Sequence, residues 1–450
     1  MLREAVDYFH SLLTDETAQQ TQALINEQLQ RQGLFFGTRP LTSVLRPRFF
    51  TRAQYRLVSQ EMRPILTAFR KIHEAALADD AFRTQFHLTE WEEELLQIDP
   101  GFRDPSPTAR MDTFFLPETG EMYLTEYNAE TPAAPAYNDA LTQAFMSLPL
   151  MHTFEKKYEV LPLPAQHNML HVILESYREW GGQGRPTIAI LDWREVPTYS
   201  EFLLFQRYFS SLGYHCIITD PRQVEYKNGK LWTDTGERID FIYKRVLISE
   251  LYAQGGIHHP VIRAVRDHAV CMVNPFRCKM LYKKASLAVL SDDMNAHLFD
   301  AKEIKAINTH IPWTRMLSER HTTYQGQPID MLPFLRDNKD TLVLKPNDDY
   351  GGRGIVLGWT VSQGDWEHAL DVGLRNPSIV QNRIPLPSEP YPSVVDGKLE
   401  IYDRLFDTAP FIWHGEFVSS CLTRLATDPL LNVTAGGGST VPTMIIEARG

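Results

Sequence analysis

The middle of the chain alternates apolar strand-like runs with a helical run, and this order restricts the fold more than any other feature. Apolar runs at 186–193 and 214–221 flank a helical pattern at 198–213, and further strand-like runs occupy 239–246 and 269–275. A helix between two strands lets them pair in parallel. The sequence therefore predicts a small parallel α/β domain at 166–275.

This unit lacks the signature of a dinucleotide site. Its first strand is followed by DWREVPTYSEF, where a dinucleotide fold would carry GxGxxG so that backbone can approach the pyrophosphate. The Walker pattern and GxSxG are also absent from the sequence. These absences argue against NAD binding by the α/β domain.

The first part of the chain predicts helices followed by a hairpin. Apolar residues recur at helical spacing in 52–78 and 87–98, and Thr89 with Glu92 forms a plausible capping box. Two alternating apolar runs surround the turn at 117–120, which is typical of a β-hairpin. We therefore expect residues 1–165 to combine a helical N-terminal region with a hairpin.

Composition limits the partners and the compartment. A formal net charge of −11 argues against broad nucleic-acid binding, which needs a positive field. The four cysteines form no CxxC pair, the N-terminus is charged throughout, and no apolar run approaches the ~18 residues of a membrane helix. We therefore expect a cytoplasmic protein without nucleic-acid or membrane partners.

The most informative segment is LVLKPNDDYGGRGIVLG at 342–358. An apolar strand leads to an acidic, glycine-rich turn and a second apolar strand. Glycines let backbone N–H groups approach phosphate oxygens, and a carboxylate can hold Mg²⁺. A solvated charged turn explains the spacing equally well. The candidate residues here are Lys345, Asp348, Asp349, Gly351, Gly352, Arg353 and Gly354.

Two further segments suit metal or phosphate. Glu126 and Asn128 alternate on one strand, so both side chains point to the same face and could share a hard cation. Lys283 and Lys284 stand near the start of a predicted helix, where cations oppose the macrodipole unless an anion lies nearby. A polar strand end and a solvated basic turn are the alternatives.

The order of these segments resembles that of the permuted ATP-grasp ligases, which include eukaryotic-type glutathione synthetase and the glutathionylspermidine synthetase-like proteins. EYNAETP resembles their magnesium motif, PFRCKMLYKKASLAVLSD their lysine-bearing helix, and VLKPNDDYGGRGIVLG their phosphate-covering hairpin. The matching blocks span roughly residues 105–450. The first hundred residues add little.

The resemblance implies an α/β fold of the ATP-grasp type, circularly permuted. Residues 1–165 would supply the helical region and the metal-binding hairpin, 166–275 an inserted pre-ATP-grasp domain, and 276–450 the nucleotide-binding portion with a glycine-rich lid. The implied activity is ATP-dependent joining of a carboxylate to an amine through an acyl phosphate. An ATP-grasp phosphotransferase and a catalytically silent nucleotide-binding module are the alternatives.

The resemblance also implies roles for particular residues. ATP and Mg²⁺ are the implied cofactors. Lys284 fits the family register better than Lys283, and Asp349 fits better than Asp348, which stays open as the metal ligand. A surface salt bridge is the alternative for Arg424. The implied sets are Glu126, Asn128 and Asp349 for metal; Lys284, Lys345, Gly351, Gly352, Gly354, Gln381, Asn382 and Ile384 for nucleotide; Arg110, Lys345 and Arg353 for catalysis; and Arg110, Arg424, Gly437, Gly438 and Ser439 for substrate.

The sequence departs from the family pattern at the hairpin turn. It reads DDYGGRG rather than a glycine triplet followed by asparagines, which could alter the contact with phosphate. The chain shows no separate amidase domain, so we expect synthesis without hydrolysis. The implied partners are a small carboxylate and an amine, drawn from amino acids, peptides or polyamines. Relatives are often dimers, which leaves a homodimer open.

Overall fold

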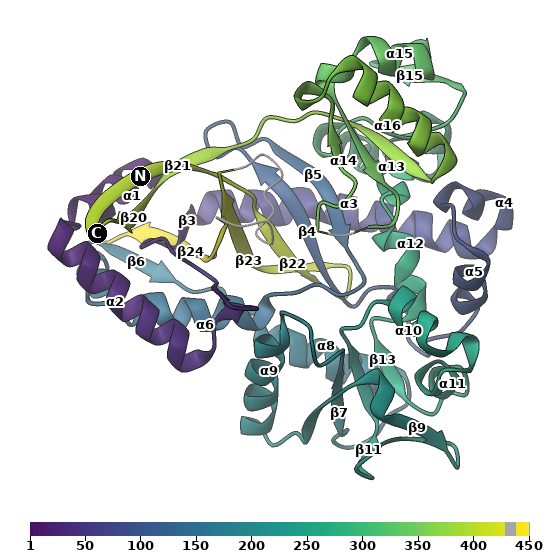
Figure 1. The fold of residues 1–450 in the computed structure, drawn as a ribbon, viewed down its shortest axis with the longest axis horizontal. Helices are drawn as coiled ribbons and strands as arrows, with labels where there is room; N and C mark the ends of the chain where they lie inside the picture. The colour runs from purple at the N-terminus through teal and green to yellow at the C-terminus, as the bar shows by residue number, and fades with distance from the viewer. Residues whose placement is uncertain (350, 428–437, 450) are drawn as a thin grey trace.

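A computed structural model describes residues 1–349, 351–427 and 438–449. Its main sheets lie in three lobes: a large mixed sheet, a parallel sheet and a small antiparallel sheet (Figure 1). The two ends of the chain lie together in the first lobe (Figure 1).

The large sheet is built from both ends of the chain. Its strand order is β20-β21-β23-β22-β4-β5, and the last strand, β24, pairs with β23, with β6 and, in parallel, with β3. The predicted hairpin at 117–120 is present as the antiparallel pair β4–β5. The strands are β3 (Arg48–Thr51), β4 (Thr108–Phe115), β5 (Met122–Asn128), β6 (Tyr158–Leu161), β20 (Ser388–Val395), β21 (Lys398–Phe406), β22 (Ala409–Trp413), β23 (Phe417–Ala426) and β24 (Ser439–Ala448).

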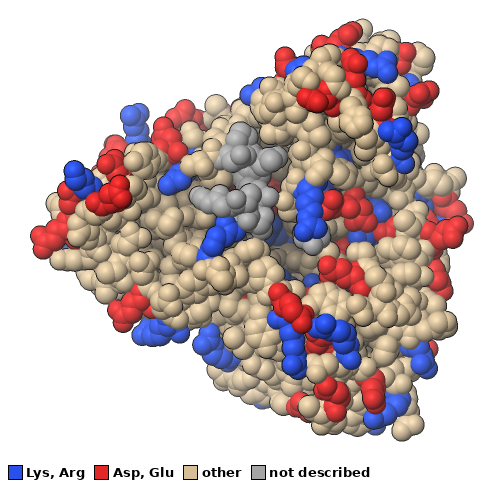
Figure 2. Space-filling model, in the orientation of Figure 1, with Lys and Arg blue, Asp and Glu red and all other residues tan. Residues whose placement is uncertain are grey.

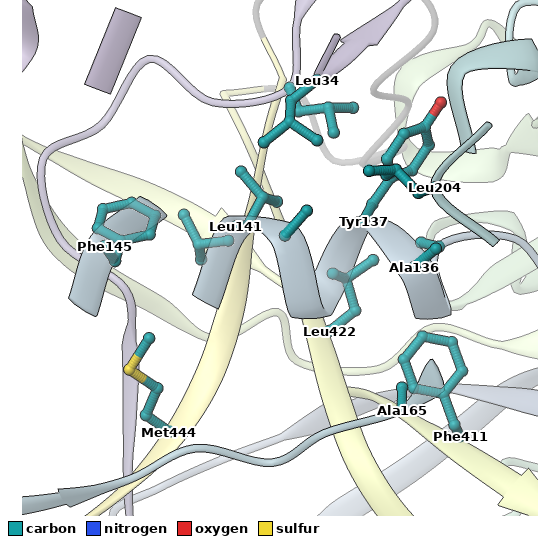
Figure 3. Close-up of a cluster of buried hydrophobic side chains, with 14 of the residues drawn as sticks. Leu34, Ala136, Tyr137, Leu141, Phe145, Ala165, Leu204, Phe411, Leu422 and Met444 are labelled. Carbon is teal, nitrogen blue, oxygen red and sulfur yellow. The ribbon is translucent and has the colours of Figure 1, made fainter. Parts of the chain in front are cut away.

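Helices cover the two faces of this sheet. The long helix α3 (Arg52–Ala78) begins at a Thr51–Gln54 capping box and packs Met62 and Phe69 into the same core as Met111 and Leu124. On the opposite face α6 (Pro135–Met146) packs on β23 and β24, and Figure 3 shows its apolar side chains beside Leu422 and Met444. The remaining elements here are α1 (Leu2–Ser11), α2 (Asp15–Gln32), β1 (Phe35–Phe36), β2 (Arg39–Pro40), α4 (Asp80–Arg83), α5 (Glu90–Leu96) and α7 (Pro149–Phe154).

The capping box predicted for the second helical run is confirmed. The Thr89 backbone N–H donates to the Glu92 carboxylate at 2.7 Å at the start of α5. This satisfies an N–H group that the helix start would otherwise leave unpaired.

The middle lobe contains the predicted parallel sheet, with the order β13-β12-β7-β8 and parallel pairing throughout. The run predicted as one strand from Ile239 divides into two strands, β11 and β12. Ile239 pairs with β10 in a separate antiparallel sheet of β9, β10 and β11, whereas Phe241 enters the parallel sheet. The elements are α8 (Gln166–Glu179), β7 (Ile188–Leu191), α9 (Tyr199–Ser211), β8 (Cys216–Thr219), β9 (Val224–Lys227), β10 (Lys230–Thr233), β11 (Arg238–Ile239), β12 (Phe241–Lys244), α10 (Ile248–Gly255), α11 (Pro260–Arg266) and β13 (Cys271–Val273).

The third lobe carries the glycine-rich hairpin. Its antiparallel sheet has the order β14-β19-β17-β18, and β17 with β18 forms the hairpin expected at 342–358. The elements are α14 (Ala301–His310), β14 (Thr314–Met316), β15 (His321–Tyr324), β16 (Gln327–Asp330), α15 (Met331–Asp337), β17 (Leu342–Pro346), β18 (Val356–Leu357), α16 (Gln363–Arg375) and β19 (Ser378–Asn382).

The helix expected with Lys283 and Lys284 near its start is present, but it does not extend back to Leu281. The segment forms two short helices, α12 (Lys279–Tyr282) and α13 (Ala285–Ser291), with an extended backbone at Lys283. The cause is Asn347, whose backbone carbonyl accepts the Lys284 N–H and whose side-chain oxygen accepts the Ala285 N–H. These N–H groups are thereby withdrawn from a continuous helix.

The helices and the cysteines correspond to features noted in the sequence. In the described part of the chain, none of the helices is both long and apolar enough to cross a membrane. All four cysteines are buried free thiols.

Candidate functional site

A cavity of about 820 Å³ lies where the three lobes meet. Strands β4, β5 and β23 of the large sheet line one side, and β17 and β19 of the third lobe line another. Figure 2 shows Lys and Arg side chains beside the hollow at the centre of the visible face. Its size lies within the range of roughly 300–1,000 Å³ typical of ligand sites.

Lys345 projects from β17 into this cavity. Its ammonium donates to the Gln381 side-chain oxygen at 2.8 Å and to the Thr125 carbonyl at 3.3 Å. Because burial disfavours the charged form, it lowers the pKa of Lys345 to about 8; Glu126 opposes this shift and Lys284 adds to it. A phosphate bound here would restore the charged form.

Lys284, at the start of α13, contacts β5, the strand that carries Glu126 and Asn128. Its ammonium lies 3.0 Å from the Glu126 carboxylate and donates to the Asp349 carbonyl at 2.7 Å. It therefore holds β5 and the glycine-rich hairpin beside each other. Lys283 points elsewhere, toward Glu92 at 2.9 Å and Asp348 at 3.2 Å.

Two of the residues expected to hold Mg²⁺, Glu126 and Asn128, have suitable chemistry and share a face of β5. In the antiparallel β4–β5 pair, Glu126 stands beside Asp112 and Asn128 beside Arg110. A carboxylate and a carboxamide on one face provide oxygen ligands of the kind that Mg²⁺ prefers. Among the described residues, no group of three or more His, Cys, Asp or Glu side chains is placed to hold a metal ion.

Asp348 is held by two buried lysines at the base of the hairpin. Its oxygens lie 2.8 Å from the Lys279 ammonium and 3.2 Å from that of Lys283. Burial favours its neutral form, but the two lysines outweigh burial and lower the pKa of Asp348. The other charges in this cluster are Glu92 and Glu130, which contact Lys283 and Lys279 respectively.

Two arginines and two aspartates alternate along the floor of the cavity. Arg110 makes a two-pronged contact with Asp112 at 2.8 and 3.1 Å, and Arg424 contacts both Asp112 and Asp407. Burial favours neutral Asp112, but the arginines outweigh it and lower the pKa of Asp112 to about 2. Burial and nearby Asp112 raise the pKa of Asp407, although Arg424 opposes this. Arg424 does form salt bridges, as the alternative expected, but its two partners are buried rather than at the surface.

The segment after β19 and Trp359, which precedes α16, line the cavity with apolar side chains. Ile384, Pro385 and Leu386 follow β19 in this lining, and the Arg383 guanidinium lies 4.1 Å from the centre of the Trp359 ring. A flat apolar wall with nearby backbone suits a planar base. Gln381 also lines this region and is oriented by Lys345 and by Thr314.

Some predicted residues line the cavity and others do not. The described residues that line it are Arg110, Glu126, Lys284, Lys345, Gly351, Gly352, Gln381, Asn382, Ile384 and Arg424. Among the described residues, those that lie outside the lining are Asn128, Asp349, Arg353, Gly354, Gly438 and Ser439. Gly437 lies outside the described residues.

Two of the residues outside the lining have local structural contacts. The Ser439 hydroxyl lies 2.9 Å from that of Ser43 and accepts the Ser43 backbone N–H at 3.1 Å. Gly354 has a φ of +67°, and a β-carbon there would lie 2.7 Å from Pro346. A side chain at this turn would therefore be strained.

Sequence reasoning missed several lining residues. Asp112 stands two positions after Arg110 on the same strand, so period-two alternation could have placed both on one face. Asp407, Trp359, Phe36 and Leu41 carry no local signal, because they reach the cavity only through packing of distant segments.

No protein-family model matches the chain. Over 335 residues it is 23% identical to a putative glutamate–cysteine ligase 2-2 from Frankia casuarinae; this alignment covers 71% of the chain but 36% of the relative. The chain therefore spans about a third of the length of that relative.

The fold also matches a solved structure. A glutathione synthetase like-effector from Globodera pallida, in its apoform, has a TM-score of 0.57 at 12% identity, covering 96% of this chain and 94% of that one. D-alanyl-alanine synthetase A from Vibrio cholerae has a TM-score of only 0.27 at 12% identity, with 58% and 74% covered, and supports no argument. The chain thus shares a mixed α/β fold with the effector along nearly all of its length.

Proposed function

We propose that the protein is an ATP-dependent carboxylate–amine ligase with a circularly permuted ATP-grasp fold. The observation that carries the proposal is the convergence of Lys284, Lys345 and the glycine-rich hairpin on one cavity, with Arg110 and Arg424 on its floor. Cations and glycine N–H groups that line one cavity suit a triphosphate.

The chain order and the relatives support the family assignment. The strand with Glu126 precedes the lysines in sequence, yet β5 and β17 meet, since Lys345 reaches the Thr125 carbonyl. The proposed division is 1–165, 166–275 and 276–450, with the first and last parts sharing the large sheet. The names of the effector and of the Frankia protein refer to a glutathione synthetase and to a glutamate–cysteine ligase, which supports a ligase.

Nucleotide would lie against the third lobe. Lys345 and Lys284 would pair with the phosphates, and the N–H groups of Gly351 and Gly352 would approach the phosphate oxygens. The base would lie near Trp359 and the segment from Gln381 to Ile384.

Metal would lie beside the phosphates. Glu126, Asn128 and Asp349 are the proposed Mg²⁺ ligands, and Asp348 is the weaker alternative because Lys279 and Lys283 already neutralise it. When bound, Mg²⁺ would neutralise phosphate charge as it shifts during transfer. Glu126 would then divide its oxygens between the metal and Lys284.

The proposed reaction has two steps. A substrate carboxylate attacks the γ-phosphorus of ATP, the bond to the β,γ-bridging oxygen breaks, and an acyl phosphate and ADP form. An amine then attacks the acyl carbon, loses a proton and displaces inorganic phosphate to form the amide. Arg110, Lys345 and Arg353 would stabilise the charge that moves in the first step. The hairpin would exclude water, which would otherwise hydrolyse the acyl phosphate.

Release of ADP tests this function. A panel of amino acids, short peptides and polyamines, supplied in pairs, should reveal ADP release that requires both a carboxylate and an amine. Lys345→Ala should lower the rate about 100-fold or more, because a charge that stabilises transfer is lost. Lys305→Ala, an exposed lysine of α14, is the matched control and should keep the wild-type rate.

Full turnover by Lys345→Ala would contradict the assignment of the site. Mass spectrometry of the product separates a ligase from a phosphotransferase, because a ligase product gains an amide and the alternative product keeps a phosphate.

A further inference from the structure

One end of the cavity is apolar and is built largely from segments outside the predicted motifs. Phe36 and Leu41 come from the N-terminal hairpin, Tyr137 from α6 and Leu422 from β23. Figure 3 shows Tyr137 and Leu422 in the apolar cluster around α6. The first hundred residues, which the family resemblance left without a role, thus supply part of the cavity wall.

This wall is held in place by hydrogen bonds within the first lobe and between the first and middle lobes. The Gly37 N–H donates to the Pro197 carbonyl at 3.0 Å, and the Ser200 hydroxyl donates to the Phe35 carbonyl at 2.9 Å. Tyr137 and Ser200 share a hydrogen bond of 2.6 Å. The Thr440 N–H binds the Leu41 carbonyl at 2.7 Å. The wall is therefore a preformed surface.

The charges on the neighbouring floor balance one another. Arg110 and Arg424 are matched by Asp112 and Asp407, each within hydrogen-bond distance of an arginine. Beside this floor, Lys284 and Lys345 share Glu126, the cross-strand neighbour of Asp112, as a nearby carboxylate. A net anion is thus drawn to the two lysines, while the floor suits a molecule that carries both charges.

We propose that this end of the cavity binds an amino-acid substrate with a bulky apolar side chain, such as leucine or phenylalanine. The side chain would lie against Phe36, Leu41 and Tyr137, and the ammonium and carboxylate would meet the alternating arginines and aspartates. This rests on the proposed ligase function and specifies one of its two substrates. A charged side chain is disfavoured because the wall offers it no counter-charge.

Phe36 and Phe35 provide a matched pair of variants. They are adjacent in β1, and both are partly buried against the same core, but only Phe36 lines the cavity described by the structure. A glutamate at either position should disturb the hairpin similarly, whereas only Phe36→Glu places a carboxylate in the proposed subsite.

Calorimetric binding to the full chain tests the inference, with Mg²⁺ and the non-hydrolysable analogue AMP-PNP present. The probes are L-phenylalanine, L-leucine, L-glutamate and L-lysine. The wild type should bind phenylalanine or leucine at least about tenfold more tightly than glutamate or lysine, in line with the loss of one buried apolar contact. Phe36→Glu should reverse the preference toward lysine and leave AMP-PNP affinity unchanged, and Phe35→Glu should behave as the wild type.

Equal affinity for apolar and charged amino acids, or equal effects of the two variants, would overturn the inference. If AMP-PNP binds but no apolar preference is seen, this inference fails and the ligase proposal stands. If AMP-PNP does not bind the wild type, both fail. Should Phe36→Glu not fold, Phe36→Ala must still weaken phenylalanine binding without weakening AMP-PNP binding.

Discussion

Lys345 is a buried lysine whose surroundings favour the binding of an anion. Among the described residues its ammonium has neutral hydrogen-bond partners, Gln381 and the Thr125 carbonyl, while Glu126 and Lys284 act on it from a distance. A buried cation with neutral partners binds its proton less tightly than one in water. The same environment makes a phosphate a favourable partner, because the ion pair would form away from solvent.

The lowered pKa of Lys345 predicts how nucleotide affinity depends on pH. Since the pKa falls to about 8, the charged form is lost as pH rises through about 8, and affinity should fall above that pH. The fall should approach about tenfold per pH unit if one proton is taken up on binding. Titration of AMP-PNP at fixed Mg²⁺ between pH 7 and 10 would measure it.

Lys345→Arg is the control for this titration. Arginine stays protonated throughout that range, so the variant should show a much flatter profile. A wild-type affinity that is constant up to pH 10 would show that Lys345 is not the group that binds the phosphates.

At the scale of one element, the glycine-rich hairpin depends on its anchor. Asp348 lies at its base and contacts Lys279 and Lys283, while the Asp349 carbonyl contacts Lys284. Three lysines from the α12–α13 segment therefore hold the hairpin against the rest of the molecule. The break between α12 and α13 permits this, because it separates the directions of Lys283 and Lys284.

Asp348→Asn should loosen this anchor. We expect the free energy of unfolding to fall by about 2 kcal/mol, since a hydrogen-bonded charge is lost opposite two buried lysines. The KM for ATP should rise because the hairpin is less well placed. Urea unfolding and steady-state kinetics would measure both effects.

Asp371→Asn on the exposed face of α16 is the control and should change neither quantity. If Asp348→Asn instead changes only the dependence on Mg²⁺ concentration, Asp348 rather than Asp349 is the metal ligand.

At the scale of the whole molecule, one buried carboxylate joins two lobes. Glu201 on α9 accepts the Ala134 and Ala136 N–H groups at the start of α6, at 2.8 and 3.2 Å, and lies 3.1 Å from the Arg245 guanidinium. Both Glu201 and Arg245 are buried. This contact sets the position of the parallel α/β unit relative to the large sheet.

Glu201→Ala should destabilise the whole chain. Its removal leaves Arg245 buried without this carboxylate and frees two N–H groups, which together predict a loss of about 3–5 kcal/mol. Chemical denaturation followed by tryptophan fluorescence would measure the change. Glu225→Ala, which breaks an exposed pair with Lys227, should cost less than about 1 kcal/mol. Equal costs for the two variants would show that the Glu201 contact does not join the lobes energetically.

Features that depend on short-range order could be predicted from the sequence alone. The parallel α/β unit, the hairpins and the capping box at Thr89 follow from spacing within a few residues. The same is true of the shared face of Glu126 and Asn128. Alternation on a strand named Glu126 and Asn128 as candidates before any contact was known, and the glycine-rich turn that follows Lys345 named that lysine.

Which of these faces meet depends on the tertiary packing of segments that are far apart in the chain. Arg424 contacts Asp112 from 312 positions away, and Lys345 reaches the Thr125 carbonyl across 220. Contacts between distant segments also produce three other features. These are the break at Lys283, the contacts of Asp348 at the base of the hairpin, and the wall formed by Phe36 and Leu41. Local periodicity orients a side chain but carries no information about its distant partner, which is selected by the packing of apolar cores and the pairing of buried charges.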